Sequence, residues 1–181
     1  MRWSQLKRRI EGGFALRVRG RVEVGLTRYR HSPHQLGEAW VTFDKRKAVT
    51  MAAIRFENAQ YEIAQRVRKE RDHLDQPYPD VAEWAEASRQ LHDSGVFHSD
   101  EFTGPIFSYL NLSIDGALSS ESAVVRAFAM LDRRLGKRRL AGIDVTNENV
   151  LVGEFHRFRS AVEGLDDLPL GRLGVPSFLR R

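Results

Sequence analysis

The chain contains no cysteine among its 181 residues. This absence excludes disulfide bonds, zinc sites with thiolate ligands and thiol catalysis, and it fits a reducing compartment. No apolar run approaches the roughly 18 residues that a membrane-spanning helix needs. The first residues also lack the apolar segment and cleavage site of an export signal. We therefore expect a cytoplasmic protein with no membrane contact.

Catalytic and metal-binding signatures are missing as well. There is no glycine-rich phosphate loop, nucleophile elbow, kinase signature, HxxxH motif or HExxH motif. His31 and His34 flank a proline, and one of them could act as a general base, although a loop histidine is more often simply solvated. We predict no catalytic residues, metal site or cofactor, and we favour a protein that is not an enzyme.

Charge is distributed unevenly along the chain, although the composition is that of an ordinary globular protein, with 41% hydrophobic and 29% charged residues. Residues 1–56 hold 13 Lys and Arg against 4 Asp and Glu, and residues 121–181 hold 11 against 8. Residues 57–120 reverse this balance, with 5 against 12. The basic ends and the acidic middle could therefore pair within the fold or face different partners.

The spacing of apolar residues predicts an α+β fold. Helices are expected over 2–11, 57–74, 81–93, 99–110, 114–118, 119–136 and 147–164, and strands over 21–30, 38–43 and 47–56. The polar link Asp44-Lys45-Arg46 indicates a hairpin between the last two strands. We expect an N-terminal helix, a three-stranded antiparallel sheet and a mostly helical C-terminal half. Residues 1–165 would form one domain, with a possible sub-boundary near 75–80 and an extended, partly mobile tail over 166–181.

The segment from 119 to 140 separates apolar from basic residues by helix geometry. At 100° per residue four apolar residues fall in one narrow sector and three cations fall opposite. The apolar set is Val124, Phe128, Leu131 and Leu135, and the cations are Arg126, Arg133 and Lys137. Ser119 or Ser120 is the expected N-cap, and Gly136 the expected stop, because a longer helix would turn Arg138 and Arg139 toward the apolar sector. Residues 133–139 would then form a compact basic exit.

Two interpretations of this basic exit remain open. Charge runs are usually solvated faces, and cations suit the C-terminal end of a helix. The planar guanidinium group of arginine is also well suited to bind carboxylate or phosphate. Asp132 could neutralise one neighbouring arginine internally.

The first 56 residues combine basic and aromatic side chains, which on a sheet can hold phosphates and stack bases. The element order α-β-β-β-α is similar to that of double-stranded-RNA-binding domains, in order only. The alternative is a soluble sheet with exposed arginines and a core Trp40. We predict a binding surface for nucleic acid or an acidic protein, and the sequence does not determine the oligomeric state. Its predicted residues are Arg28, Arg30, Arg126, Arg133, Arg134, Lys137, Arg138 and Arg139.

Two alternatives belong to other classes of protein. The first is an immunity- or antitoxin-type protein that docks on a toxin through the acidic middle. The second is a divalent-metal nuclease, for which Glu23, Glu38 and Asp44 with Lys45 or Lys47 are the only candidates. Their spacing does not reproduce a strand-borne carboxylate-x-Lys signature, and strand-edge and turn charges are the simpler interpretation.

The stretch YLNLSIDGALSSESAVVRAFAMLDRRLGKRRL, residues 109–140, resembles the signature region of a family of small, uncharacterised bacterial cytosolic proteins. The opening MRWSQLKRRIEGGFA and the following RGRVEVGLTRYR are similar to the N-terminal pattern of that family. The resemblance covers most of residues 1–140 and leaves out the chain from about Ile143. It implies no activity and no catalytic residues.

Overall fold

The computed structural model describes residues 2–28, 37–73 and 77–165. They form the predicted α+β fold, with an N-terminal helix, a three-stranded antiparallel sheet and a mostly helical C-terminal half. The helices are α1 (Trp3–Gly13), α2 (Ala53–Glu70), α3 (Val81–Asp93), α4 (Asp100–Asn111), α5 (Ile114–Leu118), α6 (Ala123–Leu131), α7 (Lys137–Ala141) and α8 (Val150–Glu163). The strands are β1 (Val22–Arg28), β2 (Gly37–Phe43) and β3 (Arg46–Ala52).

The strands form one sheet in the order β1-β2-β3. Alternate residues face the core, and across the strands Val24 pairs with Val41 and Ala39 pairs with Met51. Asp44 and Lys45 have positive φ angles of 48° and 65°. Two such residues form the tight turn whose twist matches that of the strands, so the predicted hairpin is confirmed.

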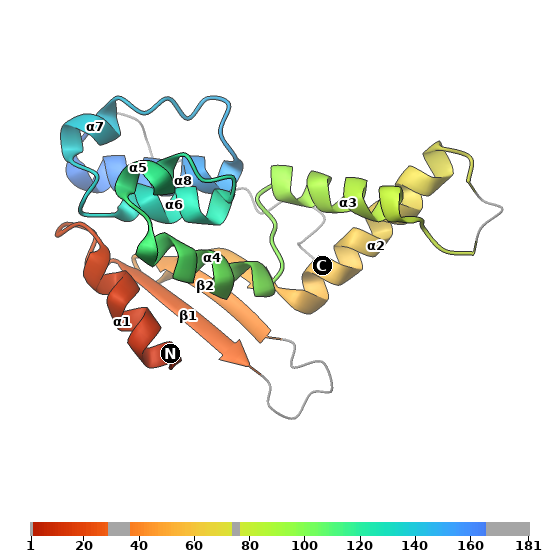
Figure 1. Cartoon of the computed structure of the whole chain (residues 1–181), viewed down its shortest axis with the longest axis horizontal. Helices are drawn as coiled ribbons and strands as arrows, with labels where there is room; N and C mark the ends of the chain where they lie inside the picture. The colour runs from red at the N-terminus through yellow and green to blue at the C-terminus, as the bar shows by residue number, and fades with distance from the viewer. Residues whose placement is uncertain (1, 29–36, 74–76, 166–181) are drawn as a thin grey trace.

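Helices of the C-terminal half pack over one face of the sheet, and α1 lies along β1 (Figure 1). Phe43 of β2 stacks on Phe158 of α8 with ring centroids 4.1 Å apart, and Phe128 of α6 contacts Phe155 of α8 at 5.5 Å. Helix α6 is buried along almost its whole length, which places it at the centre of the core. None of the described helices combines the length and apolar character needed to cross a bilayer.

Helices α2 and α3 pack against each other and project from the rest of the fold as an arm (Figure 1). The arm has an apolar cluster of its own, formed by Phe56, Ala59, Leu91 and Val96. The prediction of a strand over 47–56 is wrong beyond residue 52, because α2 begins at Ala53. No side chain caps the start of α2, so the local sequence carries no start signal there. The apolar contact of α2 with α3 stabilises the helical conformation of residues 53–56.

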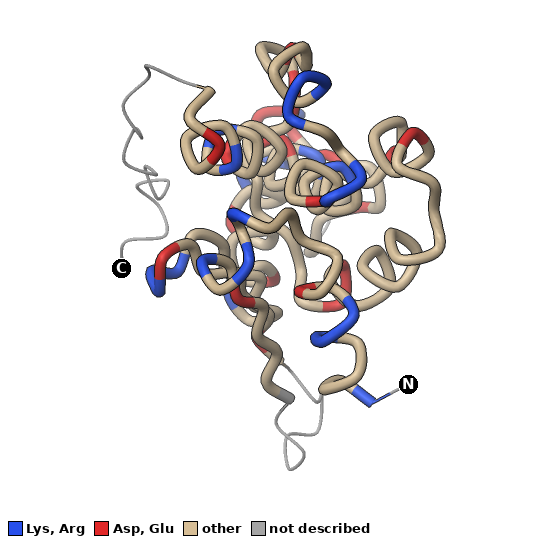
Figure 2. Tube along the Cα trace, turned by 90° about the vertical axis from the view of Figure 1, so that its left-hand side faces the viewer, with Lys and Arg blue, Asp and Glu red and all other residues tan. Residues whose placement is uncertain are grey.

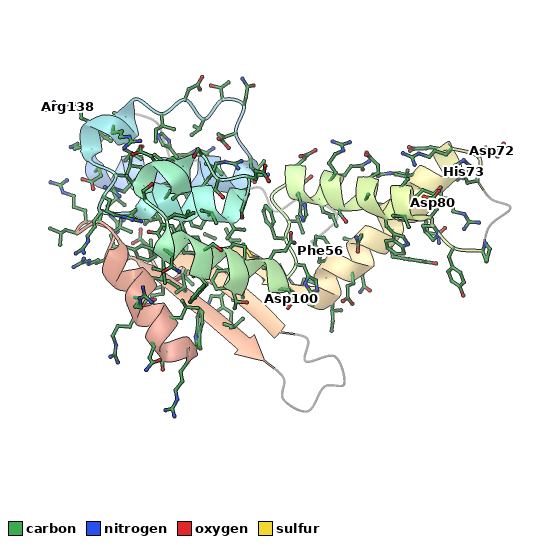
Figure 3. All side chains as sticks on the ribbon, viewed as in Figure 1. Phe56, Asp72, His73, Asp80, Asp100 and Arg138 are labelled. Atoms are coloured by element: carbon green, nitrogen blue, oxygen red, sulfur yellow. The ribbon has the colours of Figure 1, made fainter. Side chains whose placement is uncertain are left out.

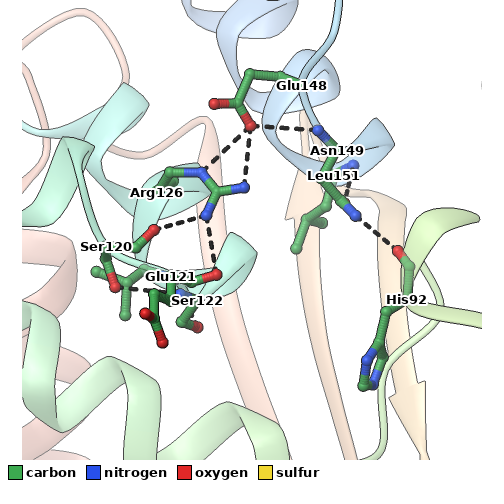
Figure 4. A network of polar contacts seen from close by, with 9 residues as sticks. His92, Ser120, Glu121, Ser122, Arg126, Glu148, Asn149 and Leu151 are labelled. Atoms are coloured by element: carbon green, nitrogen blue, oxygen red, sulfur yellow. Dashed lines mark hydrogen bonds and ion pairs between the residues drawn. The ribbon is translucent and has the colours of Figure 1, made fainter. Parts of the chain in front are cut away.

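His92 connects the arm to the rest of the fold. Its Nε2 lies 2.9 Å from a carboxylate oxygen of Glu101 in α4, and its ring stacks on Phe97 with centroids 5.1 Å apart. Its main-chain oxygen accepts a hydrogen bond of 2.6 Å from Asn149 Nδ2, at the start of α8 (Figure 4). Phe56 of α2 lies beside the same imidazole, 5.8 Å between ring centroids (Figure 3). The junction therefore joins polar and aromatic contacts from four helices.

Helix α6 begins later than predicted. Its N-cap is Ser122, whose hydroxyl accepts a hydrogen bond of 3.4 Å from the Val125 N–H. The expected cap at Ser119 or Ser120 is wrong, because Ser119 already closes the preceding helix α5. The predicted core residues Val124, Phe128, Leu131 and Leu135 are all buried, as expected.

Helix α6 also ends earlier than predicted, at Leu131 rather than near Gly136. Asp132 has an extended backbone and forms an antiparallel bridge with Phe14. Gly136 is the N-cap of α7, so residues 137–139 begin a new helix instead of forming a compact exit. The pairing of Asp132 with a segment far away in sequence replaces the helical hydrogen bonds, and no local pattern contains that information.

Candidate anion-binding depression

The turn between α6 and α7, residues 132–136, lies against the turn between α1 and β1, residues 14–21. The Ala15 N–H donates to the Leu131 carbonyl at 2.9 Å, and the Arg133 N–H donates to the Gly13 carbonyl at 3.0 Å. Figure 2 views the molecule from the side that carries this contact. The pairing brings two basic segments from opposite ends of the chain together.

An open depression of about 720 Å³ lies where the two turns meet the end of α8. Among the described residues, its lining contains six cationic side chains and one carboxylate. The lining residues are Ala15, Leu16, Arg17, Arg19, Arg133, Arg134, Leu135, Gly136, Lys137, Arg159 and Glu163. We call this feature the basic depression. Three of the predicted binding residues, Arg133, Arg134 and Lys137, therefore lie together.

Arg159 and Glu163 link the basic depression to the buried core. Arg159 is only 3% exposed, and its Nε donates to a Glu163 carboxylate oxygen at 2.9 Å. Its other nitrogens donate to the carbonyls of residues 130, 132 and 135, at 3.2–3.3 Å. Lys137 Nζ donates to the Glu163 main-chain oxygen at 2.6 Å. Arg159 therefore holds the α6–α7 turn in place and has its donors occupied.

Asp132 organises the other side of the depression. Its carboxylate accepts hydrogen bonds from the Tyr109 hydroxyl at 2.7 Å and from the backbone N–H, Nε and Nη2 of Arg134 at 2.7–3.0 Å. Burial alone would raise the pKa of Asp132, but the hydrogen bonds from Arg134 and Tyr109 outweigh burial and lower it. Burial, with the adjacent carboxylate, raises the pKa of Tyr109 well above its usual value. Asp132 was predicted to neutralise one neighbouring arginine, and in the structure that arginine is Arg134.

Two guanidinium groups of the depression keep most of their hydrogen-bonding capacity. Arg133 is exposed, and its side chain has no hydrogen-bond or ion-pair partner within the described ranges. Arg17 is 65% exposed at its side chain, and its ion pair with Glu163 is long, at 3.9 Å. Arg19 differs, because it donates to the Phe14 and Gly12 carbonyls at 3.0 and 2.6 Å. Arg17 and Arg133 are therefore the groups best placed to bind an external anion.

Arg126 lies outside the basic depression and is fully engaged. Its Nε and Nη2 donate to a Glu148 oxygen at 3.2 and 3.0 Å, and its Nη1 donates to the carbonyls of Ser120 and Glu121 at 2.6 and 2.9 Å (Figure 4). These bonds link the start of α6 to the start of α8. Arg126 serves the fold rather than an exposed surface.

Two more of the predicted binding residues, Arg138 and Arg139, do not line the depression. Arg139 forms an ion pair with Asp115 of α5. Arg138 points outward from α7, with no partner among the described residues (Figure 3). Arg28 ends β1 at the strand terminus opposite the depression, and Arg30 lies outside the described residues. The predicted set is therefore divided among several regions.

Trp40 of β2 is half-buried rather than in the core, and it contacts its neighbours in the sheet. Trp40 lies against Gly25, where an added Cβ would stand only 2.0 Å from the indole ring. Lys47 Nζ lies 5.2 Å from the centre of the same ring. With Gly25 on the adjacent strand and Lys47 over the ring, Trp40 is a packing residue of the sheet.

Two of the three carboxylates proposed for a metal nuclease, Asp44 and Glu38, are each paired with a cation. Arg21 donates to Asp44 through Nε and Nη2 at 2.7 and 2.6 Å, and this holds the pKa of Asp44 below its usual value. Lys47 Nζ lies 2.5 Å from a Glu38 carboxylate oxygen. Within the described residues, no group with metal-ligand spacing contains Glu23, Glu38 or Asp44. His31 and His34 lie outside the described residues.

One group of possible metal ligands lies at the tip of the arm, formed by His73, Asp80 and Glu83 (Figure 3). The Asp80 carboxylate accepts from the Glu83 N–H, and the Glu83 carboxylate accepts from the Asp80 N–H, both at 2.8 Å. His73 Nδ1 lies 3.0 Å from the other Glu83 oxygen. This reciprocal pairing is a capping box that starts α3, and it explains the group without a metal.

Sequence reasoning missed Arg17, Arg19, Arg159 and Glu163 as parts of the site. Arg17 and Arg19 belong to the basic N-terminal segment, but their spacing does not reveal that they meet residues 133–137. Arg159 lies on the helix α8, among apolar residues of the core. Only the three-dimensional pairing of the two turns shows that these residues belong to one site.

Of the comparisons with known proteins, the comparison with family models finds a match. No curated protein and no solved structure matches the chain. The model of the SF0329 protein family matches residues 2–160, and so extends past the predicted limit near residue 140 into α8. This match includes every residue that lines the basic depression except Glu163. The chain belongs to the SF0329 protein family.

Proposed function

We propose that the protein is a non-enzymatic binding protein that uses the basic depression to contact an acidic partner, either nucleic acid or protein. The observation that carries this proposal is the meeting of six cationic side chains with one carboxylate in a single open depression. Two of the cations, Arg17 and Arg133, are exposed and keep donors for an external oxyanion. Their backbone positions are fixed by the paired turns, which reduces the entropy lost on binding.

The acidic middle of the chain leaves this surface open. Asp115, from residues 57–120, pairs with Arg139, which does not line the depression. The carboxylates that contact the lining cations, Asp132 and Glu163, both come from the C-terminal third of the chain. Among the described residues, the predicted competition by the acidic middle is therefore limited to Arg139.

The test is binding of labelled polyanions, measured by fluorescence anisotropy in 50 mM salt. The probes are a 20-base-pair DNA, a duplex RNA of equal length and a polyglutamate peptide. Loss of a hydrogen-bonded contact to a charged group costs ~1.5–3 kcal/mol, so we expect Arg133→Glu to weaken binding by about tenfold or more. Arg138→Glu is the matched control, because it makes the same charge change outside the depression.

Two results would contradict the proposal. One is the absence of binding to all three probes at low salt. The other is an equal loss of affinity in Arg133→Glu and Arg138→Glu, which would show that only net charge matters. Binding that falls steeply with added salt in the native protein is the supporting result.

An immunity- or antitoxin-type protein is the second candidate, and the arm favours it. Tyr78 and Val81 near the tip of the arm are 71% and 85% exposed, and Tyr61 on α2 is 46% exposed. Exposed apolar side chains on a projecting helix pair suit a protein contact. This function requires a protein that co-purifies in a one-to-one ratio and is released by Val81→Asp, but not by Arg133→Glu.

A further inference from the structure

Leu16 gives the basic depression an apolar side chain at its rim. It is 80% exposed, whereas its neighbour Ala15 and the nearby Val18 are buried. The turn is fixed by hydrogen bonds from the N–H groups of Val18 and Arg19 to the Ala15 carbonyl, at 2.9 and 3.1 Å. A single exposed leucine is common on protein surfaces. Leu16 is distinguished by its position in the same lining as the two available guanidinium groups.

The composition of the lining favours a protein over a nucleic acid. Five of its six cations are arginine, and protein interfaces favour arginine and disfavour lysine. Surfaces that bind single-stranded nucleic acid add aromatic residues for stacking, and none of the described residues that line this depression is aromatic. Glu163 also stands in the lining. Its carboxylate is held by Arg159 and is only 12% exposed, so it contributes little to the choice between the two partners.

We infer that the acidic partner is a protein segment in which an apolar side chain is flanked by carboxylates. The apolar side chain packs on Leu16, and the flanking carboxylates accept hydrogen bonds from Arg17 and Arg133. The guanidinium group presents two parallel N–H donors to a carboxylate, so each arginine takes one acidic side chain. This inference rests on the proposed function, and it specifies the partner of the same depression.

The experiment compares two labelled peptides of equal length and charge, one alternating Glu with Leu and one alternating Glu with Ser, and a 20-base-pair RNA. We expect the native protein to bind the Glu-Leu peptide about tenfold more tightly than the Glu-Ser peptide, because an apolar side chain is removed from water. Leu16→Ser should abolish this preference by weakening binding of the Glu-Leu peptide about tenfold. Arg133→Glu should weaken binding of both peptides.

Val81→Ser is the matched control, since it removes an equally exposed apolar side chain from the arm. It should keep the tenfold preference. Leu16 is exposed, so Leu16→Ser should retain the native thermal unfolding midpoint, and circular dichroism checks this.

The outcomes separate this inference from the proposed function. Equal binding of the two peptides, or a preference that survives Leu16→Ser, would overturn the inference and leave the proposed function standing. RNA binding tighter than that of either peptide, unaffected by Leu16→Ser, would also overturn the inference, in favour of a nucleic-acid partner. If no probe binds, both fall together.

Discussion

Replacement of Asp132 by alanine should destabilise the protein strongly. Its carboxylate accepts hydrogen bonds from two parts of the fold, helix α4 and the turn between α6 and α7. The side chain is 3% exposed and accepts hydrogen bonds from Tyr109 and Arg134. The buried Tyr109 hydroxyl would lose its partner, at a cost of ~1–3 kcal/mol. Arg134 is 41% exposed, so water can replace its ion pair, and this part of the loss is about 1 kcal/mol or less. The expected total is about 1–4 kcal/mol.

Urea unfolding followed by circular dichroism measures this loss, and a double-mutant cycle with Tyr109→Phe assigns it. Tyr109→Phe removes the donor and leaves the bonds from Arg134 in place, so its cost should be smaller, ~1–2 kcal/mol. The double variant should be less destabilised than the sum of the single variants, by ~1–2 kcal/mol. A loss below about 0.5 kcal/mol for Asp132→Ala, or simple additivity, would refute the reasoning.

The Asp132 carboxylate should also make the stability of the protein depend on pH in the acidic range. Because the folded protein holds the pKa of Asp132 below its usual value, Asp132 contributes stability above about pH 4, and this is lost as the pH falls through the folded pKa. Asp132→Asn keeps the shape and removes the titration. The stability of the native protein should therefore fall more steeply below pH 4 than that of the variant, in urea titrations at pH 3 to 5.

Two further predictions concern the sheet and the arm. Gly25→Val should cost ~1–3 kcal/mol in the free energy of unfolding, because its Cβ would stand 2.0 Å from the Trp40 ring. Adding Trp40→Ala should relieve part of that cost. An unchanged midpoint of urea unfolding in Gly25→Val would contradict the close contact. The hydrogen bond with Glu101 raises the pKa of His92 despite partial burial, so its stabilisation of the arm is complete below about pH 6.5 and lost as the pH rises through the folded pKa. Hydrogen exchange in α3 should therefore be slower, relative to the intrinsic rate, at pH 6 than at pH 8, and Glu101→Gln should remove this difference.

Local sequence signals were sufficient where the ends of a helix are set by its own residues. Helix α3 has the predicted bounds, since Asp80 and Glu83 form a capping box at its start and Gly95, with a positive φ of 76°, follows its end. Helix α5 also has its predicted bounds, with Ser113 as N-cap. The end of α6 differs because residues 13–15 determine it, and they come from the other end of the chain.

The candidate site was predicted only in part, because charge patterns do not show which cations already have partners. Arg126 looks like a surface cation in the helical projection, and Arg139 was predicted as part of the basic exit, yet Glu148 and Asp115 bind them from other elements. Arg133 and Arg134 are adjacent, and the sequence does not show which of them Asp132 neutralises. In the structure Arg134 is hydrogen-bonded to Asp132, and Arg133 is exposed.

The two adjacent arginines have different roles: Arg134 contributes to stability, and we expect Arg133 to contribute to binding. Arg134 and Arg159 are held by Asp132 and Glu163, and these pairs fix the turn that presents Arg133. Arg133 has no such partner among the described residues and lies in one lining with five other cations, so like charges oppose its position. Arg133→Glu should therefore leave the free energy of unfolding unchanged within about 0.5 kcal/mol, or raise it, while it lowers affinity for an acidic partner. A residue whose loss harms binding and spares stability belongs to a recognition surface; one whose loss harms both, as we expect for Asp132, belongs to the support beneath it.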